Sequence, residues 1–154
     1  MSTNPSKDKG SRAETLVKET LRKFTGLPFE RTPLSGALDA KHGLKSDVYV
    51  PKEKNLFSIE VKHYSSTYLD YSVLTSTNST LLTWWEQSKR EASQNGNKPL
   101  LIYKHDRSKI FVAFEEEPKE LDAYRWILIN HERGIFYTSI LEDWLKHENP
   151  KFIA

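Results

Sequence analysis

The sequence predicts one domain of the α/β class. Helical and strand periodicities alternate along a chain of 154 residues, a length that fits a single compact domain. Hydrophobic residues make up 37% of the chain against only 6 Gly and 7 Pro, which is enough apolar mass for a patterned core and excludes global disorder. The chain contains no cysteine, so disulfides, thiolate nucleophiles and Cys-bound zinc are excluded. Any chemistry must come from carboxylates, histidine, lysine or hydroxyl groups.

The first half of the chain predicts a helix followed by strands. Residues 1–10 are expected to form a flexible tail, because the capping-box spacing of Ser11 and Glu14 places the start of structure at Ser11. The apolar spacing that follows predicts an amphipathic helix over 12–24, which ends at Gly26 and Pro28. A short strand, a loop and the two arms of a hairpin are expected over 29–32, 33–45, 47–50 and 56–63, with the hairpin turn at 51–55.

The second half predicts a helix, two strands, a hairpin and a last helix. The hydroxyl-rich residues 64–78 are structurally ambiguous. Trp84 and Trp85 lie on the apolar face of a helix from about Ser79 to a stop at Asn95-Gly96-Asn97. We expect them in the core or a dimer interface, with stacking on DNA bases as the less favoured alternative. The remaining elements are strands over 100–104, 110–114, 124–129 and 135–137 and a helix over 139–147, which a capping box at Ser139 opens. We therefore expect a core over 11–114 and an acidic C-terminal extension over 115–154, a hairpin and a helix packed on the same domain.

Charge and hydropathy limit the partners. No stretch approaches the roughly 20 apolar residues that cross a bilayer, and the polar N-terminus lacks the apolar segment of a signal peptide. We therefore expect a soluble, cytoplasmic protein without a membrane partner. The net charge of +2 is uneven, because residues 115–154 carry nine acidic against five basic residues, a balance of −4 that leaves +6 for residues 1–114. A basic front half allows a polyanionic partner, although a solvated lysine-rich surface is an equal alternative.

Two predicted strands bring together a constellation of charged residues. Glu60 and Lys62 share one face of their strand, and hairpin pairing would place Asp47 beside them. Carboxylate oxygens suit Mg²⁺ or Mn²⁺, which polarises a phosphate and lowers the pKa of a bound water, while the lysine orients that water or stabilises developing charge. This is the outline of a phosphodiester hydrolysis site. Taken alone, the tripeptide Glu60-Val61-Lys62 fits a cross-strand ion pair at least as well.

Two helical residues fit the same constellation. Glu14 shares the spacing i, i+3, i+7 with Val17 and Leu21, so it borders the buried stripe and can face the sheet as a further acid of a metal cluster. Its alternative role is in the capping box. Gln87 lies beside the tryptophan stripe of the second long helix, where it can hold a water or the scissile phosphate. The five histidines show no short metal-ligand spacing, and only His63, directly after the Glu60 strand, calls for a test.

Together these motifs resemble the Holliday-junction resolvases of archaeal and viral type, within the PD-(D/E)XK nuclease superfamily. The resemblance covers about residues 9–114 and runs through Lys9-Gly10-Ser11-x-x-Glu14, Arg31-Thr-Pro-Leu-Ser35-Gly36-Ala37, Ser46-Asp47, Glu60-Val61-Lys62 and Glu86-Gln87. It implies a restriction-endonuclease-like fold, a central mixed β-sheet flanked by helices. It also implies a homodimer that nicks paired strands of a four-way DNA junction with Mg²⁺, for which Mn²⁺ is expected to substitute.

The resemblance also implies roles for individual residues. Asp47, Glu60, the Val61 carbonyl and Glu14 correspond to metal ligands, and Lys62 corresponds to the water-activating lysine. Ser35 corresponds to a loop hydroxyl near the cleaved strand, and Gln87 to a helix residue near the site. The residues expected to follow DNA, with solvated charge as the alternative for the basic ones, are Lys9, Arg12, Arg31, Ser35, Lys41, Lys45, Lys89 and Arg90.

The chain departs from the family pattern in three places. Ser46 replaces the Pro or Gly that often precedes the Asp, and neither residues 64–78 nor the acidic extension has a counterpart. These departures leave the DNA substrate open. A nuclease of repair, restriction or phage genome degradation on the same core is an alternative, and a catalytically inactive DNA-binding or protein-interaction module is another. A phage origin, with action in the host cytoplasm, fits each of the nuclease alternatives.

Overall fold

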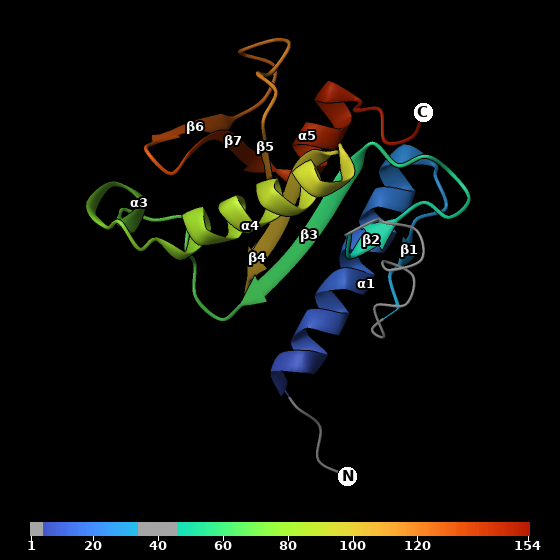
Figure 1. Ribbon diagram of the computed structural model, residues 1–154, viewed down its shortest axis with the longest axis horizontal. Coiled ribbons are helices and arrows are strands. Elements are labelled where there is room, and N and C mark those ends of the chain that lie inside the picture. The colour runs from blue at the N-terminus through green and yellow to red at the C-terminus, as the bar shows by residue number, and fades with distance from the viewer. Residues whose placement is uncertain (1–4, 34–45) are drawn as a thin grey trace.

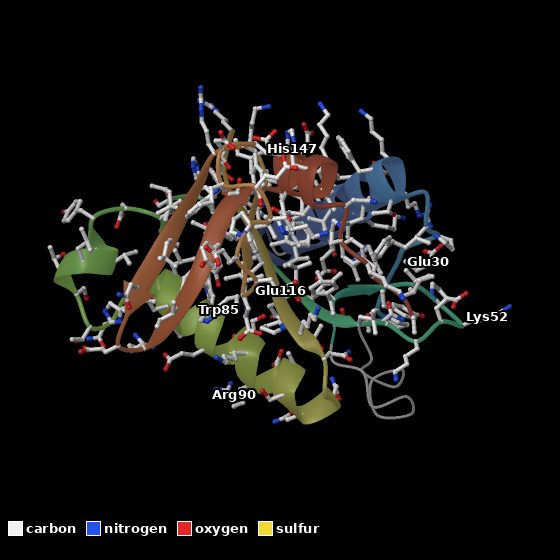
Figure 2. The ribbon with its side chains drawn as sticks, turned by 90° about the horizontal axis from the view of Figure 1, so that it is seen from above. Glu30, Lys52, Trp85, Arg90, Glu116 and His147 are labelled. Carbon is white, nitrogen blue, oxygen red and sulfur yellow. The ribbon has the colours of Figure 1, made fainter. Side chains whose placement is uncertain are left out.

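A mixed five-stranded sheet with helices on both faces forms the centre of the computed structural model, which describes residues 5–33 and 46–154 (Figure 1). The strand order is β3-β4-β5-β7-β6; β3 and β4 are parallel, and the other neighbours are antiparallel. Helix α4 covers one face, and α1 and α5 lie on the other (Figure 2). This is the α/β, restriction-endonuclease-like architecture that the sequence predicts. The elements are α1 (Pro5–Thr25), β1 (Glu30–Arg31), β2 (Val48–Tyr49), β3 (Phe57–Tyr64), α3 (Ser72–Thr75), α4 (Thr80–Asn95), β4 (Lys98–His105), β5 (Phe111–Phe114), β6 (Trp126–His131), β7 (Gly134–Ile140) and α5 (Leu141–Glu148).

Helix α1 begins earlier than the capping-box spacing predicts. It starts at Pro5, so the described part of the expected tail, residues 5–10, is helical and Ser11 lies inside the helix. Proline suits the first turn of a helix, because the N–H that it lacks has no partner there and its φ is already helical. The Ser11 hydroxyl instead accepts a hydrogen bond from Arg31. The end of the helix is as predicted, since Gly26 has a φ of +75° and its N–H binds the Arg22 carbonyl.

The predicted hairpin between residues 47–50 and 56–63 is wrong in its pairing. Strand β2 pairs with β1, and β3 pairs in parallel with β4 over eight residues, so α4 is the crossover between β3 and β4. The Asn55 side chain closes the turn onto both the N–H and the carbonyl of Val50, and thereby occupies the groups that would have started a ladder. The two segments still touch through Asp47 and Ser46, which bond directly to Ile59 and Val61 of β3.

The C-terminal hairpin is part of the central sheet. Strand β7 pairs with β5 from Phe111↔Ile140 to Phe114↔Tyr137, and β6 follows as the outer strand. Residues 115–154 therefore supply two of the five strands, because β5 needs β7 to satisfy its second edge. The capping box at Ser139 is not formed: its hydroxyl donates to the Arg125 carbonyl, and α5 starts after Ile140 without a side-chain cap.

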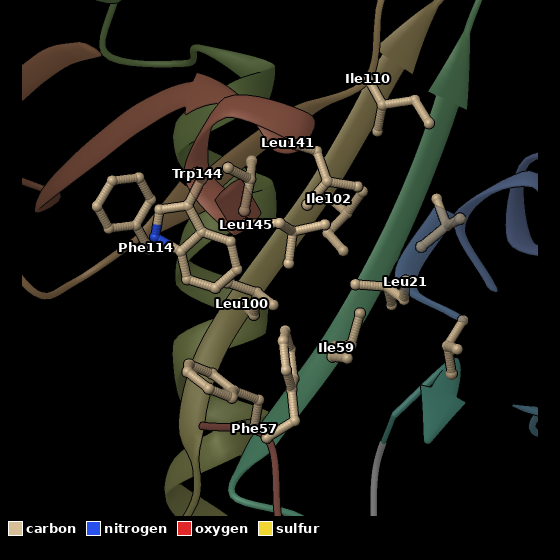
Figure 3. Packing of buried hydrophobic residues seen from close by; sticks show 14 of the residues in the cluster. Leu21, Phe57, Ile59, Leu100, Ile102, Ile110, Phe114, Leu141, Trp144 and Leu145 are labelled. Atoms are coloured by element: carbon tan, nitrogen blue, oxygen red, sulfur yellow. The ribbon is translucent and has the colours of Figure 1, made fainter. Parts of the chain in front are cut away.

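Two apolar clusters fill the two faces of the sheet. The larger one joins α1 and α5 to Ile59, Leu100 and Ile102 (Figure 3). Phe152, near the C-terminus, packs edge-on against Phe29 in the same cluster. The smaller one lies under α4 and contains Trp84 and Trp85, which confirms their prediction as core residues. The period-two pattern of β3 thus buries alternate side chains on the α1 face and turns Glu60 and Lys62 toward the α4 face. Within the described ranges, no helix is long and apolar enough to span a bilayer.

Candidate active site

Asp47 is fixed by the main chain on three sides. Its carbonyl accepts a hydrogen bond from the N–H of Thr32 at 2.9 Å, and its own N–H donates to the Ile59 carbonyl at 2.7 Å. Its carboxylate Oδ2 accepts from the N–H of Val61 at 2.8 Å. The buried Ser46 hydroxyl supports this arrangement, because it donates to the Val48 carbonyl and accepts from the N–H of Ile59. A serine before the aspartate therefore has a structural function that proline or glycine could not supply.

Glu60 and Lys62 complete the centre of the site on β3. They share a strand face, and Lys62 Nζ lies 3.4 Å from Glu60 Oε1. The side chains are 20% exposed for Lys62 and 15% for Glu60, so the pair is only partly open to solvent. Asp47, Glu60 and Lys62 thus come together as the sequence predicts, although through side-chain bonding of Asp47 to the edge of β3 and not through a hairpin ladder.

The carboxylates of this site repel one another. Burial raises the pKa of Asp47 to about 6, and the charges of Glu14 and Glu91 act in the same direction, while the Val61 N–H and Lys62 oppose it. Burial also raises the pKa of Glu60 to about 8, reinforced by Asp47 and Glu91 and opposed by Lys62. One lysine does not balance this negative charge, so the site favours either protons or a bound cation.

Glu14 reaches the site from α1, as its position on the helix predicts. Its charge acts on Asp47, and burial raises its own pKa while Arg31 lowers it. Arg31 Nη2 lies 3.2 Å from Glu14 Oε1 and also donates to the Ser11 hydroxyl at 3.1 Å. Arg31 was expected to contact DNA. In the structure its guanidinium binds the Glu14 carboxylate on α1.

Helix α4 brings Glu91 to the site, a residue that the sequence analysis does not single out. Gln87 is half-buried and donates from Nε2 to Glu91 Oε1 at 3.3 Å. Glu91 acts on the pKa values of both Asp47 and Glu60, so it faces the site one helical turn after Gln87. The i, i+4 spacing from Gln87 was the available signal for Glu91. Glu86 points elsewhere, because it binds Arg133 of the β6–β7 turn.

The donor set fits a hard divalent cation. Asp47 and Glu60 present carboxylate oxygens, and the Val61 carbonyl faces the same edge as the Val61 N–H that binds Asp47, because both groups of a strand residue point to one side. Mg²⁺ is typically held by one or two carboxylates and keeps several waters. Among the described residues, no group of three or more acidic or histidine side chains is positioned to hold a metal ion, so Glu14 and Glu91 do not complete a cage with Asp47 and Glu60. A metal ion held by these two carboxylates and the Val61 carbonyl would take its remaining ligands from water.

The expected DNA contacts in the described residues lie on different elements. Lys9 binds Asp106 at 3.0 Å, and Lys89 binds Glu115 at 3.3 Å. Arg12 and Arg90 are exposed on α1 and α4, and Arg90 projects outward from α4 (Figure 2). The expected contacts at Ser35, Lys41 and Lys45 lie outside the described residues.

Fold and site together define the PD-(D/E)XK class, in which an aspartate and a Glu-x-Lys strand meet at one edge of a mixed sheet. The sequence model of the family described as "Phage putative PDDEXK endonuclease" matches residues 5–151, and the chain belongs to this family. A curated relative, Protein D14 of Escherichia phage T5, is 35% identical over 148 residues that cover 92% of each chain. No solved structure matches the protein.

Proposed function

We propose that the protein is a metal-dependent, structure-selective DNA endonuclease that resolves four-way junctions by paired symmetric nicks. The observation that carries the proposal is the meeting of Asp47, Glu60 and Lys62, with Asp47 bonded to the N–H of Val61 and Lys62 beside Glu60. Membership of a family described as phage endonucleases supports the nuclease part and a role in the infected cell. The junction as substrate rests on the resemblance of the motifs over residues 9–114.

Each residue of the site would have its own role in the reaction. Asp47, Glu60 and the Val61 carbonyl would hold Mg²⁺ or Mn²⁺, with Glu14 as a further acid; the ion supplies Lewis acidity at the phosphate and a more acidic water. The Lys62 ammonium donates hydrogen bonds to the attacking water or to the phosphoryl oxygen on which negative charge grows. Gln87, whose amide donates to Glu91, would hold a water or the scissile phosphate. Burial of Asp47 and Glu60 strengthens each of these interactions.

Paired nicks on two strands require two sites in one assembly. A two-fold homodimer supplies them with the symmetry of the junction, because each protomer presents the same face to an equivalent strand. The net positive charge of residues 1–114 favours a polyanionic partner such as branched DNA.

Cleavage of an end-labelled four-way junction and of a linear duplex of the same sequence tests the proposal. We expect Mg²⁺-dependent or Mn²⁺-dependent symmetric nicks near the branch point, which Asp47→Asn abolishes. Asp122→Asn, which makes the same change on the exposed 115–122 loop, is the matched control and should cleave as the wild type does. Undiminished cleavage by Asp47→Asn would refute the assignment of the site.

The same experiment separates the alternatives. Equal cleavage of junction and duplex would keep the chemistry and replace the junction resolvase by a general PD-(D/E)XK nuclease of repair, restriction or genome degradation. Tight junction binding without cleavage by the wild type would indicate an inactive DNA-binding module. A mass measurement in solution, with and without junction, tests the homodimer.

A further inference from the structure

A cavity of about 280 Å³ opens directly beside the site, between α1 and the last residues of β3. Its lining continues from the strand residues that carry the site to the following turn and to the second turn of α1. The lining residues are Lys9, Gly10, Val61, Lys62, His63, Tyr64 and Ser65. A molecule in this cavity would therefore lie against β3 at Lys62, next to the site, and against the N-terminal part of α1.

Lys9 is held at this cavity by residues far away in the sequence. Its Nζ binds Asp106 Oδ2 at 3.0 Å, and the other oxygen of that carboxylate lies 2.9 Å from His63 Nε2. The turn that carries Asp106 is attached to β3, because the Asp106 N–H donates to the Tyr64 carbonyl. Asp106 thus fixes an ammonium group that keeps two further N–H donors for a ligand. The charge of Lys104 also acts on His63, so a further cation lies near the Lys9–Asp106 pair.

Within the residues that the structure describes, no packing contact explains the glycine at position 10. A glycine inside a helix costs about 1 kcal/mol relative to alanine. Apart from its own helix, a Cβ at Gly10 would meet no atom of the described residues within 4 Å, and no positive φ requires glycine there. A missing side chain at the wall of a cavity allows the close approach of a partner to the helix backbone.

We propose that this cavity binds a backbone phosphate of the DNA strand within one or two nucleotides of the cleaved linkage. Lys9 is the cationic contact, and Gly10 lets the sugar-phosphate chain approach α1. Lys62 lines both the cavity and the site, so a phosphate held here fixes the position of the strand relative to the reacting phosphate. This inference rests on the proposed nuclease function and adds a binding site to it.

The first test measures whether Lys9 contacts one particular backbone phosphate. Junctions with a single neutral methylphosphonate linkage at each position around the nick are bound to the Asp47→Asn protein in Mg²⁺, with and without Lys9→Ala. One neutral linkage should weaken binding about tenfold when Lys9 is present and have no further effect on the Lys9→Ala protein, because the charged hydrogen bond is already lost. The slope of log affinity against log salt should fall by about one in Lys9→Ala. Lys23→Ala, at the other end of α1, is the matched control and should keep both properties.

The second test uses the glycine. Gly10→Ala should raise the Tm by about 2–4 °C, because alanine favours the helix and the Cβ meets open space. It should nevertheless weaken junction binding several-fold, because the Cβ occupies the path of the strand. A gain in stability without loss of binding would overturn the inference, and so would equal losses at every neutral linkage with and without Lys9. Neither result touches the nuclease proposal, which fails only if the wild type cleaves no DNA or if Asp47→Asn still cleaves it.

Discussion

The pKa values of Asp47 and Glu60 make the site a source of instability as long as no cation is bound. Both are raised by burial and by neighbouring carboxylates, to about 6 and about 8. The unfolded chain releases these protons near the ordinary values of about 4. Between those values and the raised ones the folded protein holds more protons than the unfolded one, so stability falls as the pH rises through this window.

We therefore predict that the metal-free protein melts at a lower temperature at about pH 8.5 than at about pH 5.5. Glu60→Gln should remove most of this dependence and raise the Tm at the higher pH by about 2 °C or more, equivalent to about 1 kcal/mol for a chain of this length. Added Mg²⁺ should raise the Tm of the wild type mainly at the higher pH. Thermal melts at both pH values measure these differences in Tm, and Glu120→Gln, on the exposed 115–122 loop, is the control. Identical dependences of Tm on pH for the wild type and Glu60→Gln would contradict the prediction.

At the scale of the elements, α4 packs closely against the β6–β7 hairpin through Trp85, in addition to the ion pair between Glu86 and Arg133. Trp85 is fully buried and stacks on Phe136 at 4.6 Å between ring centroids. A Cβ on Gly134 would lie 2.8 Å from Trp85 Cδ1, so only glycine fits at the start of β7.

We predict that Gly134→Ala destabilises the protein by about 1–3 kcal/mol through overpacking. Urea unfolding measures the loss, and Ile135→Ala is the control because Ile135 is 60% exposed and its truncation should change the stability by less than about 0.5 kcal/mol. Equal stabilities of the two variants would show that Trp85 moves aside without cost.

The sequence predicts most elements and the local pairing of β6 with β7, but not the partner of β3. Period-two and helical spacing are local, so the strand of Glu60 and the helix of Trp84 are found close to their observed bounds. Pairing depends on segments far apart: β3 takes β4 as its partner, and Asn55 prevents the local hairpin. Capping boxes at Ser11 and Ser139 fail because Pro5 and Ile140 set the helix starts.

The site was predictable for a related reason. Asp47, Glu60 and Lys62 needed only neighbouring segments to meet, and two of them share a strand face. Glu91 was not predictable to the same degree, since its charge is one of many on α4 and only the packing of α4 on β3 turns it toward Glu60. The bond between Arg31 and Glu14 needs the fold of β1 against α1.

At the scale of the whole molecule, the sheet cannot be divided at residue 114. Strand β5 ends there and takes β7 as its outer neighbour, while Trp144 and Phe152 complete the cluster beneath Phe57. We predict that a fragment of residues 1–114 shows no cooperative thermal transition by circular dichroism and no dispersed amide signals, in contrast to the full chain. A sharp transition of the fragment would mean that the first three strands of the sheet suffice as a folding unit.

The hydrogen bond between the Asp47 carboxylate and the N–H of Val61 also limits pairing of β3 with another copy of the chain. Strand β3 is an outer strand of its sheet, and a free row of N–H and carbonyl groups on such a strand is a template for pairing with another chain. Asp47 closes this row at its centre, so the residue that crowds negative charge into the site also keeps the strand from aggregating. Asp47→Asn retains an oxygen acceptor for the Val61 N–H, whereas Asp47→Ala leaves that N–H without its partner, so the alanine variant should be the less soluble of the two.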